Sequence, residues 1–210
     1  MTTSEKPDTE VADAQQLRAL VGEVHLLAER KVLDRLDRFC RDFIALSPFL
    51  VLATANREGG VDASPRGDGP GFVEVLDERT LLIPDRRGNN RIDSFRNVLS
   101  SPGVGLVFFV PGINETLRVN GRARLTRDTA LLDPTTVQEK TPKLGLLVEV
   151  DEAYFHCGKA LIRSKLWAQD AQVERGSFPT LGRIVAEQTK AVDAAEADAK
   201  LEEAYRTRLY

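Results

Sequence analysis

Residues 81–96 read LLIPDRRGNNRIDSFR, and this stretch decides both the fold and the candidate site. The run begins with three apolar residues that favour a β-strand, and Pro84 and Gly88 then mark a turn. Apolar residues next recur at the spacing of one helical face: Ile92, Phe95, Val98 and Leu99. The pattern predicts a strand that runs through a turn directly into a helix.

Basic and amide side chains crowd the turn of this unit. They are Arg86, Arg87, Asn89, Asn90 and Arg91. The first turn of a helix has backbone N–H groups without partners, and the helix dipole is positive there. The arrangement predicts an anion site, most naturally for a phosphate group. A capped helix after a solvated basic turn explains the same residues, and both interpretations stay open at this point.

Two further segments carry side chains suited to a flat, anionic ligand. Residues 62–68, DASPRGD, end a predicted strand, and Ser64 and Arg66 lie on one face of it. Arg66 can bind a phosphate bidentately, although a surface turn is the plainer explanation of this segment taken alone. Residues 163–167, RSKLW, place Trp167 beside basic residues, where it either stacks on a ring or, more simply, plugs an edge of the core.

The spacing of hairpins predicts six or seven short strands in a closed antiparallel sheet. Residues 49–55 and 104–110 are apolar throughout, which predicts strands buried on both faces. Residues 116–125 alternate between an apolar face and an arginine-rich face. Because helices do not alternate with strands, the chain is not a doubly wound α/β protein.

Helical patterns flank the predicted sheet. Residues 11–46 carry two apolar stripes that Gly22 separates or weakens, and the second stripe begins at Val32. A final helix is predicted over roughly residues 180–209, and its mostly polar composition is typical of solvent exposure or of contact with a partner. We expect residues 1–10 to form a disordered tail.

Composition excludes several classes of protein. The chain has 210 residues and a formal net charge of −3, which argues against a general binder of nucleic acids or membrane surfaces. No apolar run reaches the ~20 residues of a membrane span, and the polar N-terminus lacks the apolar segment of a signal peptide. We therefore expect a cytoplasmic protein.

The cysteines and histidines predict neither a disulfide nor a metal site. Cys40 and Cys157 are expected to be unpaired, because the protein carries no export signal. His156 and Cys157 are neighbours on a predicted strand, so their side chains point to opposite faces and cannot share a metal. We expect Cys157 to be buried and His156 to be half-exposed.

Taken together, these segments resemble the pyridoxamine 5'-phosphate oxidase-related, FMN-binding split-barrel family. The resemblance rests on five segments in the family's order: residues 49–55 (FLVLATA), 62–68 (DASPRGD), 83–91 (IPDRRGNNR), 157–160 (CGKA) and 163–167 (RSKLW). It is greatest for a bacterial subgroup with the signature Pro-Asp-Arg-x-Gly-Asn-Asn-Arg, and it covers roughly residues 31–167.

The resemblance implies a mainly β fold, a split β-barrel with flanking helices. It divides the chain into an N-terminal tail and helix (residues 1–30), an FMN-binding split-barrel domain (31–167) and a C-terminal helical extension (168–210). It also implies a homodimer with FMN in a groove between the subunits. The implied cofactor-binding residues are Ser64, Pro65, Arg66, Pro84, Asp85, Arg86, Asn89, Asn90, Arg91, Lys165 and Trp167.

In the implied arrangement, these residues contact different parts of FMN. The segments that begin at Ser64 and Pro84 would run along the isoalloxazine and the ribityl chain. The turn from Asn89 to Arg91, with Arg86 or Arg66, would hold the 5'-phosphate. The other subunit often supplies the late segment with Lys165 and Trp167.

The implied activity is that of an FMN-dependent oxidoreductase that moves electrons or hydride between a reduced donor and a small molecule. A nicotinamide or a deazaflavin is a candidate donor. No catalytic side chain is assigned, because the flavin carries the redox chemistry. Arg66 and Lys165 are the residues expected to reach the reactive side of the ring. Oxidation of pyridoxamine phosphate is not implied, because Asn89 and Asn90 replace the basic pair of the oxidases proper and no histidine follows His156.

Three alternatives stay open. The first is a non-catalytic flavin-binding or electron-carrier protein, and the second is a haem-binding split barrel with His25 or His156 as the axial ligand. The third is a dimeric scaffold without a cofactor. A homodimer has separate support, because a strand that is apolar on both faces, as in residues 104–110, needs a helix or a second subunit over its outer face.

Overall fold

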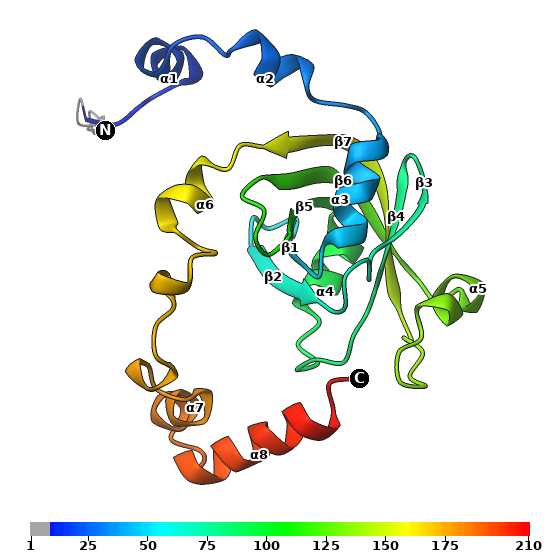
Figure 1. The fold of residues 1–210 in the computed structure, drawn as a ribbon, viewed down its shortest axis with the longest axis vertical. Helices are drawn as coiled ribbons and strands as arrows, with labels where there is room; N and C mark the ends of the chain where they lie inside the picture. Colours follow the sequence, from blue (N-terminus) through cyan, green and yellow to red (C-terminus); the bar gives the residue numbers. More distant parts are fainter. Residues whose placement is uncertain (1–8) are drawn as a thin grey trace, which may run out of the picture. The chain divides into compact units, whose positions relative to one another are not determined.

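The computed structural model describes residues 9–210, and the chain divides into two compact units, Met1–Val32 and Leu33–Tyr210 (Figure 1). Most of the predicted N-terminal tail, residues 1–10, lies outside the described residues. No helix in residues 9–210 is long and apolar enough to cross a membrane. The cytoplasmic location and the division into three domains stay predictions.

The first unit holds two short helices, α1 (Ala14–Val21) and α2 (Leu26–Arg30). The Asp13 carboxylate caps α1, because it accepts a hydrogen bond of 2.8 Å from the backbone N–H of Gln16. Gly22 ends α1 with a φ of +78°, which glycine adopts without a steric penalty. Gly22 therefore separates the two helices, which is one of the two outcomes expected from the sequence.

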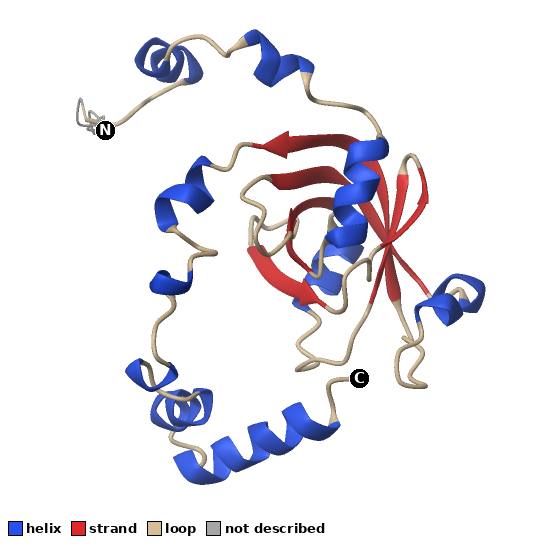
Figure 2. Ribbon diagram, viewed as in Figure 1, coloured by secondary structure: helices blue, strands red, loops and turns tan. Residues whose placement is uncertain are grey.

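A seven-stranded antiparallel sheet forms the centre of the second unit, in the order β2-β1-β5-β6-β7-β4-β3 (Figure 2). Its strands are β1 (Phe49–Ala55), β2 (Val61–Gly67), β3 (Glu74–Asp77), β4 (Thr80–Pro84), β5 (Gly103–Phe109), β6 (Thr116–Thr126) and β7 (Gly145–His156). The mainly β split barrel with flanking helices is confirmed. The prediction that the sheet is closed is wrong, because β2 and β3 lie at its two ends and, among the described residues, no strand pairing joins them.

The core lies between the inner face of this sheet and two helices, α3 (Arg38–Leu46) and α4 (Asp93–Ser100). Alternate residues of β1 and β5 point inward, so that Leu50 and Leu106 are fully buried. Leu81 on β4 is also fully buried, and Phe95 on α4 is nearly so. The core thus holds the turn between β4 and α4 at both of its ends.

The outer face of β1 and β5 is open in a single chain. Phe49 is 39% exposed, and Val51, Val107 and Phe109 are only partly buried. The rings of Phe49 and Phe109 lie side by side, with centroids 6.1 Å apart. The expectation that residues 49–55 and 104–110 are buried on both faces is therefore wrong for one chain, because α3 and α4 pack on the inner face.

The alternation predicted for residues 116–125 is confirmed in β6. Leu117 and Val119 are fully buried, whereas Arg122 and Arg124 are exposed. A β-bulge interrupts the pairing of β6 with β7 after Asn120.

The second N-terminal helix is shorter than its apolar stripe predicts. It begins at Arg38, because Leu33 forms an isolated β-bridge with Ala153. The Asp37 carboxylate then caps the helix by accepting a hydrogen bond of 2.8 Å from the backbone N–H of Cys40.

Two further helical predictions need correction. On α4, Phe95 and Val98 are buried as predicted, but Ile92 and Leu99 are 55% and 74% exposed. The single helix predicted near the end of the chain is in fact a pair, α7 (Leu181–Thr189) and α8 (Ala194–Thr207). The break follows Lys190, whose φ of +53° ends α7 in the left-handed region.

The remaining elements are short: α5 (Thr129–Leu132), η1 (Asp133–Thr135), α6 (Lys159–Ser164), η2 (Gln169–Ala171) and η3 (Arg175–Ser177). Cys157 and His156 are both exposed, so the expectation of a buried Cys157 is wrong. The reason is that β7 ends at His156 and the chain leaves the sheet there.

Candidate functional site

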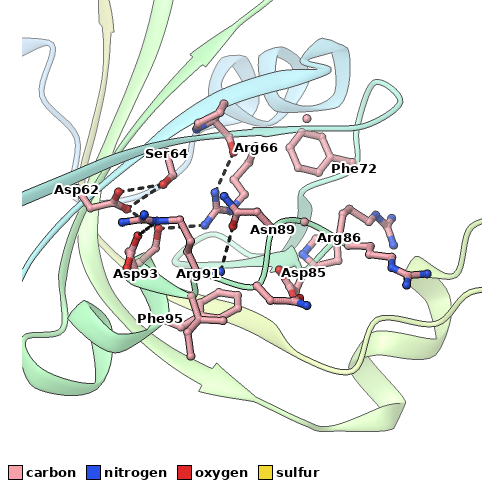
Figure 3. A pocket seen from close by; sticks show the side chains of 18 residues that line it. Asp62, Ser64, Arg66, Phe72, Asp85, Arg86, Asn89, Arg91, Asp93 and Phe95 are labelled. Carbon is pink, nitrogen blue, oxygen red and sulfur yellow. Dashed lines mark hydrogen bonds and ion pairs between the residues drawn. The ribbon is translucent and has the colours of Figure 1, made fainter. Parts of the chain in front are cut away.

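A cavity of about 560 Å³ opens where β2, the turn after β4 and the first turn of α4 meet (Figure 3). This volume lies within the range of small-molecule sites. Nine of the predicted cofactor-binding residues line it: Ser64, Pro65, Arg66, Pro84, Asp85, Arg86, Asn89, Asn90 and Arg91. The fold therefore brings the DASPRGD segment and the PDRRGNNR segment to one place.

The helix α4 begins at this cavity without a side-chain cap. Its N-cap residue is Ile92, which has no side chain able to accept a hydrogen bond from the first turn. Ile92 and Asn90 both have positive φ, +54° and +59°, and the left-handed region is costly for the β-branched isoleucine. The Asn89 side chain accepts a hydrogen bond of 3.1 Å from the backbone N–H of Arg91, which shapes the turn. A strained turn thus presents an uncapped helix start to the cavity.

Arg66 reaches from β2 toward this helix start (Figure 3). Its guanidinium donates hydrogen bonds of 3.0 Å to the Ser94 hydroxyl and 2.9 Å to the Pro65 carbonyl. Burial lowers the pKa of Arg66, while Asp85 and Asp62 act in the opposite direction. The two hydrogen-bond acceptors are neutral, so a cation that has lost much of its water lacks a directly bonded anion.

Asp62 fixes Arg66 indirectly, through a serine. The Ser94 hydroxyl donates a hydrogen bond of 2.6 Å to the Asp62 carboxylate and accepts the one from Arg66. The Ser64 hydroxyl donates to the same carboxylate at 2.9 Å. Ser94 is 2% exposed. This chain of hydrogen bonds holds the guanidinium in one orientation.

Asp85 is a second carboxylate at the cavity. Burial raises its pKa, and the nearby guanidinium groups of Arg66 and Arg86 only partly oppose that effect. The structure thus places a half-buried carboxyl group, with a weakened preference for the ionised form, beside the predicted anion site.

The other arginines of the turn differ in how they are held. Arg86 is 15% exposed in its side chain and forms an ion pair of 2.5 Å with Asp68, which is 5% exposed. Arg91 pairs with Asp93 at 2.8 Å in a largely exposed position. Arg87 lines the cavity and is exposed. The cavity therefore combines one largely buried, paired arginine with more exposed cationic groups.

Lys165 and Trp167 do not line this cavity within one chain. Lys165 ends α6 with a φ of +52°, and its amine pairs with Asp170 at 3.3 Å. The Trp167 indole donates a hydrogen bond of 2.8 Å to the Ile113 carbonyl. In the single chain, Trp167 therefore caps an edge of the barrel, which is the simpler of its two interpretations.

Several lining residues do not follow from sequence reasoning. Asp62 shares the period-two spacing of Ser64 and Arg66, so the strand pattern could have identified it. Phe72, Ser94 and Phe95 also line the cavity, and they give no separate sequence signal.

Taken as a whole, the arrangement suits an anion beside a larger uncharged group. Cationic side chains and free helix amides converge at one end, where a phosphate would be bound. Buried Pro84 and Phe95 add apolar surface. The described lining contains no histidine and no cysteine, so a redox function at this cavity requires a bound group.

Comparisons with known proteins agree with this arrangement. The family model of pyridoxamine 5'-phosphate oxidase matches residues 36–157. No curated protein matches. Many solved structures match, among them three at low identity, and a likeness of this degree carries no functional argument. HupZ of Group A Streptococcus is 16% identical with a TM-score of 0.47, and the match covers 57% of this chain and 92% of that chain.

An FMN-binding protein from Syntrophomonas wolfei is 13% identical with a TM-score of 0.45, and the match covers 56% of this chain and 83% of that chain. An F420 reductase is 16% identical with a TM-score of 0.40, and the match covers 55% of this chain and 94% of that chain. The family model, in contrast, spans more than half of the chain and includes the strands and the turn that form the cavity. The chain therefore belongs to the pyridoxamine 5'-phosphate oxidase family.

Proposed function

We propose that the cavity binds FMN and that the protein is an FMN-dependent oxidoreductase. The observation that carries the proposal is the uncapped start of α4, which faces the half-buried Arg66. Both features are costly in an isolated chain, since the free helix amides lack partners and the half-buried cation has only neutral hydrogen-bond acceptors. One terminal phosphate would satisfy both.

In this proposal, different residues of the cavity contact different parts of FMN. Arg66, Arg91 and the α4 amides hold the phosphate, and Asn90 adds amide donors. The backbone around Pro65 and Pro84 runs along the ribityl chain and the ring. Asp62 orients Arg66 through Ser94 and has no contact with the phosphate itself.

FMN, when bound, supplies hydride or single-electron transfer, and the side chains of this protein bind and orient it. The reduced donor is a nicotinamide or a deazaflavin, and the acceptor is a small molecule. Oxidation of pyridoxamine phosphate is not proposed, because the turn offers Asn89 and Asn90 in place of a basic pair. A haem site is not proposed either, since no histidine lines the described cavity.

We further propose that a second copy of the chain covers the outer face of β1 and β5. On that face Phe49 is exposed and Val51 and Val107 are only partly buried, next to the strand β2 that carries Arg66. The second copy would bring its own Lys165 and Trp167 to the FMN. Sedimentation of Val107→Glu tests this, with the highly exposed Val61→Glu as the control. A dimer that persists in Val107→Glu contradicts this part of the proposal.

Reconstitution tests FMN binding. Purified protein is mixed with FMN and desalted, and its visible absorption is recorded. We expect a retained flavin spectrum in the wild type and in Arg96→Ala, an exposed residue on α4 outside the cavity, and a loss in Arg66→Ala. No retained flavin in any form overturns the proposal. Retained FMN that no nicotinamide or deazaflavin reduces would instead assign the non-catalytic, electron-carrier role.

A further inference from the structure

Tyr210 returns to the candidate site from the far end of the chain. Its hydroxyl donates a hydrogen bond of 2.7 Å to the Asp68 carboxylate, across 142 residues of sequence. Its ring lies 5.8 Å from the guanidinium carbon of Arg86, which is the distance of a cation–π contact. Both partners belong to loops that border the cavity.

These contacts fix Arg86 on three sides. Its Nε donates to Asp68 at 2.5 Å, its Nη1 donates to the Thr135 carbonyl at 2.9 Å, and its face meets the ring of Tyr210. The remaining nitrogen, Nη2, is the group that this arrangement leaves for a ligand, and Arg86 lines the cavity. Its orientation therefore depends on Asp68.

Asp68 itself depends on Tyr210. One carboxylate oxygen accepts hydrogen bonds from the Tyr210 hydroxyl and from the backbone N–H of Gly69, while the other accepts from Arg86. Burial alone would raise the pKa of Asp68, but these hydrogen bonds hold it below its ordinary value. Tyr210 thus joins the loop after β2 to the turn after β4.

The segment that delivers Tyr210 packs mainly on itself. After Trp167 the chain runs through α7 and α8, which pack against each other, and it returns to the barrel beside the cavity (Figure 1). The hydrogen bond of Trp167 to Ile113 and that of Tyr210 to Asp68 attach its two ends to the barrel. The end of α8 is therefore attached at the ligand site.

We propose that Tyr210 is a positioning residue for Arg86. Its hydroxyl locks Asp68, and Asp68 presents the Arg86 guanidinium to the ligand phosphate. This inference rests on the proposed function, because the phosphate is that of FMN. Since linkage is reciprocal, bound FMN also holds the end of α8 on the barrel.

Tyr210→Phe tests the inference, because it keeps the ring over Arg86 and removes only the hydroxyl. Tyr205→Phe is the matched control, because Tyr205 lies near the end of α8, shortly before Tyr210, and is 57% exposed. We expect Tyr210→Phe to weaken FMN binding by about fivefold, less than the full effect of one hydrogen bond to a charged group, because the hydroxyl acts only through Asp68 and Arg86. Affinity for riboflavin, which lacks the phosphate, should not change. Asp68→Asn should weaken FMN at least as much.

A second measurement follows hydrogen exchange in residues 67–71. We expect faster exchange in Tyr210→Phe than in Tyr205→Phe, and slower exchange when FMN is added to the wild type. Equal FMN affinity in Tyr210→Phe and the control overturns the inference. An equal loss of FMN and riboflavin affinity also overturns it, because that result describes a general structural role.

The two proposals fail in distinguishable ways. If the wild type binds no FMN, the proposed function fails, and exchange of residues 67–71 alone then decides whether Tyr210 positions Asp68. Faster exchange in Tyr210→Phe supports that contact, and unchanged exchange overturns it.

Discussion

Two clefts of similar size in the second unit both combine arginines with the start of a helix, yet only one suits an anion. The second cleft, of about 590 Å³, lies between η3, α7 and α8 and is lined by Arg175 and Arg183. There the start of α7 is capped twice. The Thr180 hydroxyl accepts from the Arg183 N–H at 3.2 Å, and Asp198 of α8 accepts from the Gly182 N–H at 2.9 Å.

At α4 no side chain makes such a cap, and the Asp62 carboxylate is linked to Arg66 only through the Ser94 hydroxyl. The comparison teaches that basic residues near a helix start are not sufficient for an anion site. The helix amides must be left without partners, and the cation must be at least half-buried with neutral acceptors. The first cleft meets both conditions, and the second meets neither, since Arg183 is paired with Glu187 at 2.9 Å.

Removal of the half-buried Arg66 should have the largest effect on FMN affinity. We expect Arg66→Ala to weaken FMN about 100-fold, because a charge-assisted contact with the phosphate is lost inside the cavity. Arg183→Ala, in the second cleft, should leave FMN affinity unchanged. Isothermal titration calorimetry measures both. Equal losses of FMN affinity in the two variants would contradict the assignment of FMN to the first cleft.

A carboxylate placed at the start of α4 should make the first cleft resemble the second. Ile92→Asp introduces a negative cap, so we expect FMN affinity to fall about 30-fold while the free energy of unfolding rises by ~0.5–1 kcal/mol. The neutral Ile92→Asn has a similar shape and should keep most of the affinity. An Asp variant that binds FMN as well as the Asn variant does would show that the phosphate lies elsewhere.

The reverse change removes one of the two caps in the second cleft and frees the Gly182 N–H. We expect Asp198→Ala to lower the free energy of unfolding by ~1–2 kcal/mol, because a helix cap is lost, and to create no FMN site. Urea denaturation gives the stability, and a flavin titration of the Arg66→Ala, Asp198→Ala double variant reveals any new site. Flavin binding by that double variant would mean that an uncapped helix start is sufficient by itself.

The Arg86–Asp68 ion pair at the first cleft should make the free energy of unfolding depend on pH. Hydrogen bonds hold the pKa of Asp68 below its ordinary value, so this carboxylate stabilises the fold above its unfolded pKa and loses that contribution as pH falls through its folded pKa. We expect Asp68→Asn to cost ~2 kcal/mol near neutral pH, with the difference from wild type shrinking as pH falls below the ordinary aspartate pKa of about 4. Urea denaturation across that range measures it, and a difference that does not shrink would contradict the assignment.

Asp85 should give the smallest effect, with the opposite sign. Because burial raises its pKa, its ionised form destabilises the fold above the folded pKa, and that cost disappears below the unfolded pKa. Asp85→Asn should therefore unfold at a higher temperature than wild type at pH 7 and at an equal temperature in acid. It should also bind FMN about threefold more tightly, because a negative charge near the phosphate is removed. Weaker binding would show that the carboxylate contacts the ligand directly.

The sequence predicted the first cleft because its signals are local. Ser64 and Arg66 follow the period of a strand, and the PDRRGNNR turn lies between a buried strand and a helix that the core holds in place. Asp62 lies on the same face of β2 as Ser64 and Arg66, yet its negative charge argues against a place in an anion site. The Tyr210–Asp68 contact joins positions 142 residues apart, and no local pattern describes it.

Other predictions failed because helical spacing and apolar runs do not report tertiary contacts. The stripe from Val32 onward continues through Leu33, whose β-bridge with Ala153 prevents a helix there. The apolar runs of β1 and β5 predict burial on both faces, but one chain supplies a cover for one face only. Lys165 and Trp167 are likewise away from the cavity of their own chain, and the proposed second copy would account for both observations.

The most direct test of the account is a calorimetric titration of the wild-type protein with FMN and, separately, with riboflavin. The two ligands differ only in the phosphate, which the account places at the start of α4 beside Arg66. We expect FMN to bind at least about 100-fold more tightly than riboflavin, in line with charge-assisted hydrogen bonds in a buried site. Equal affinities, or no binding of either ligand, would contradict it.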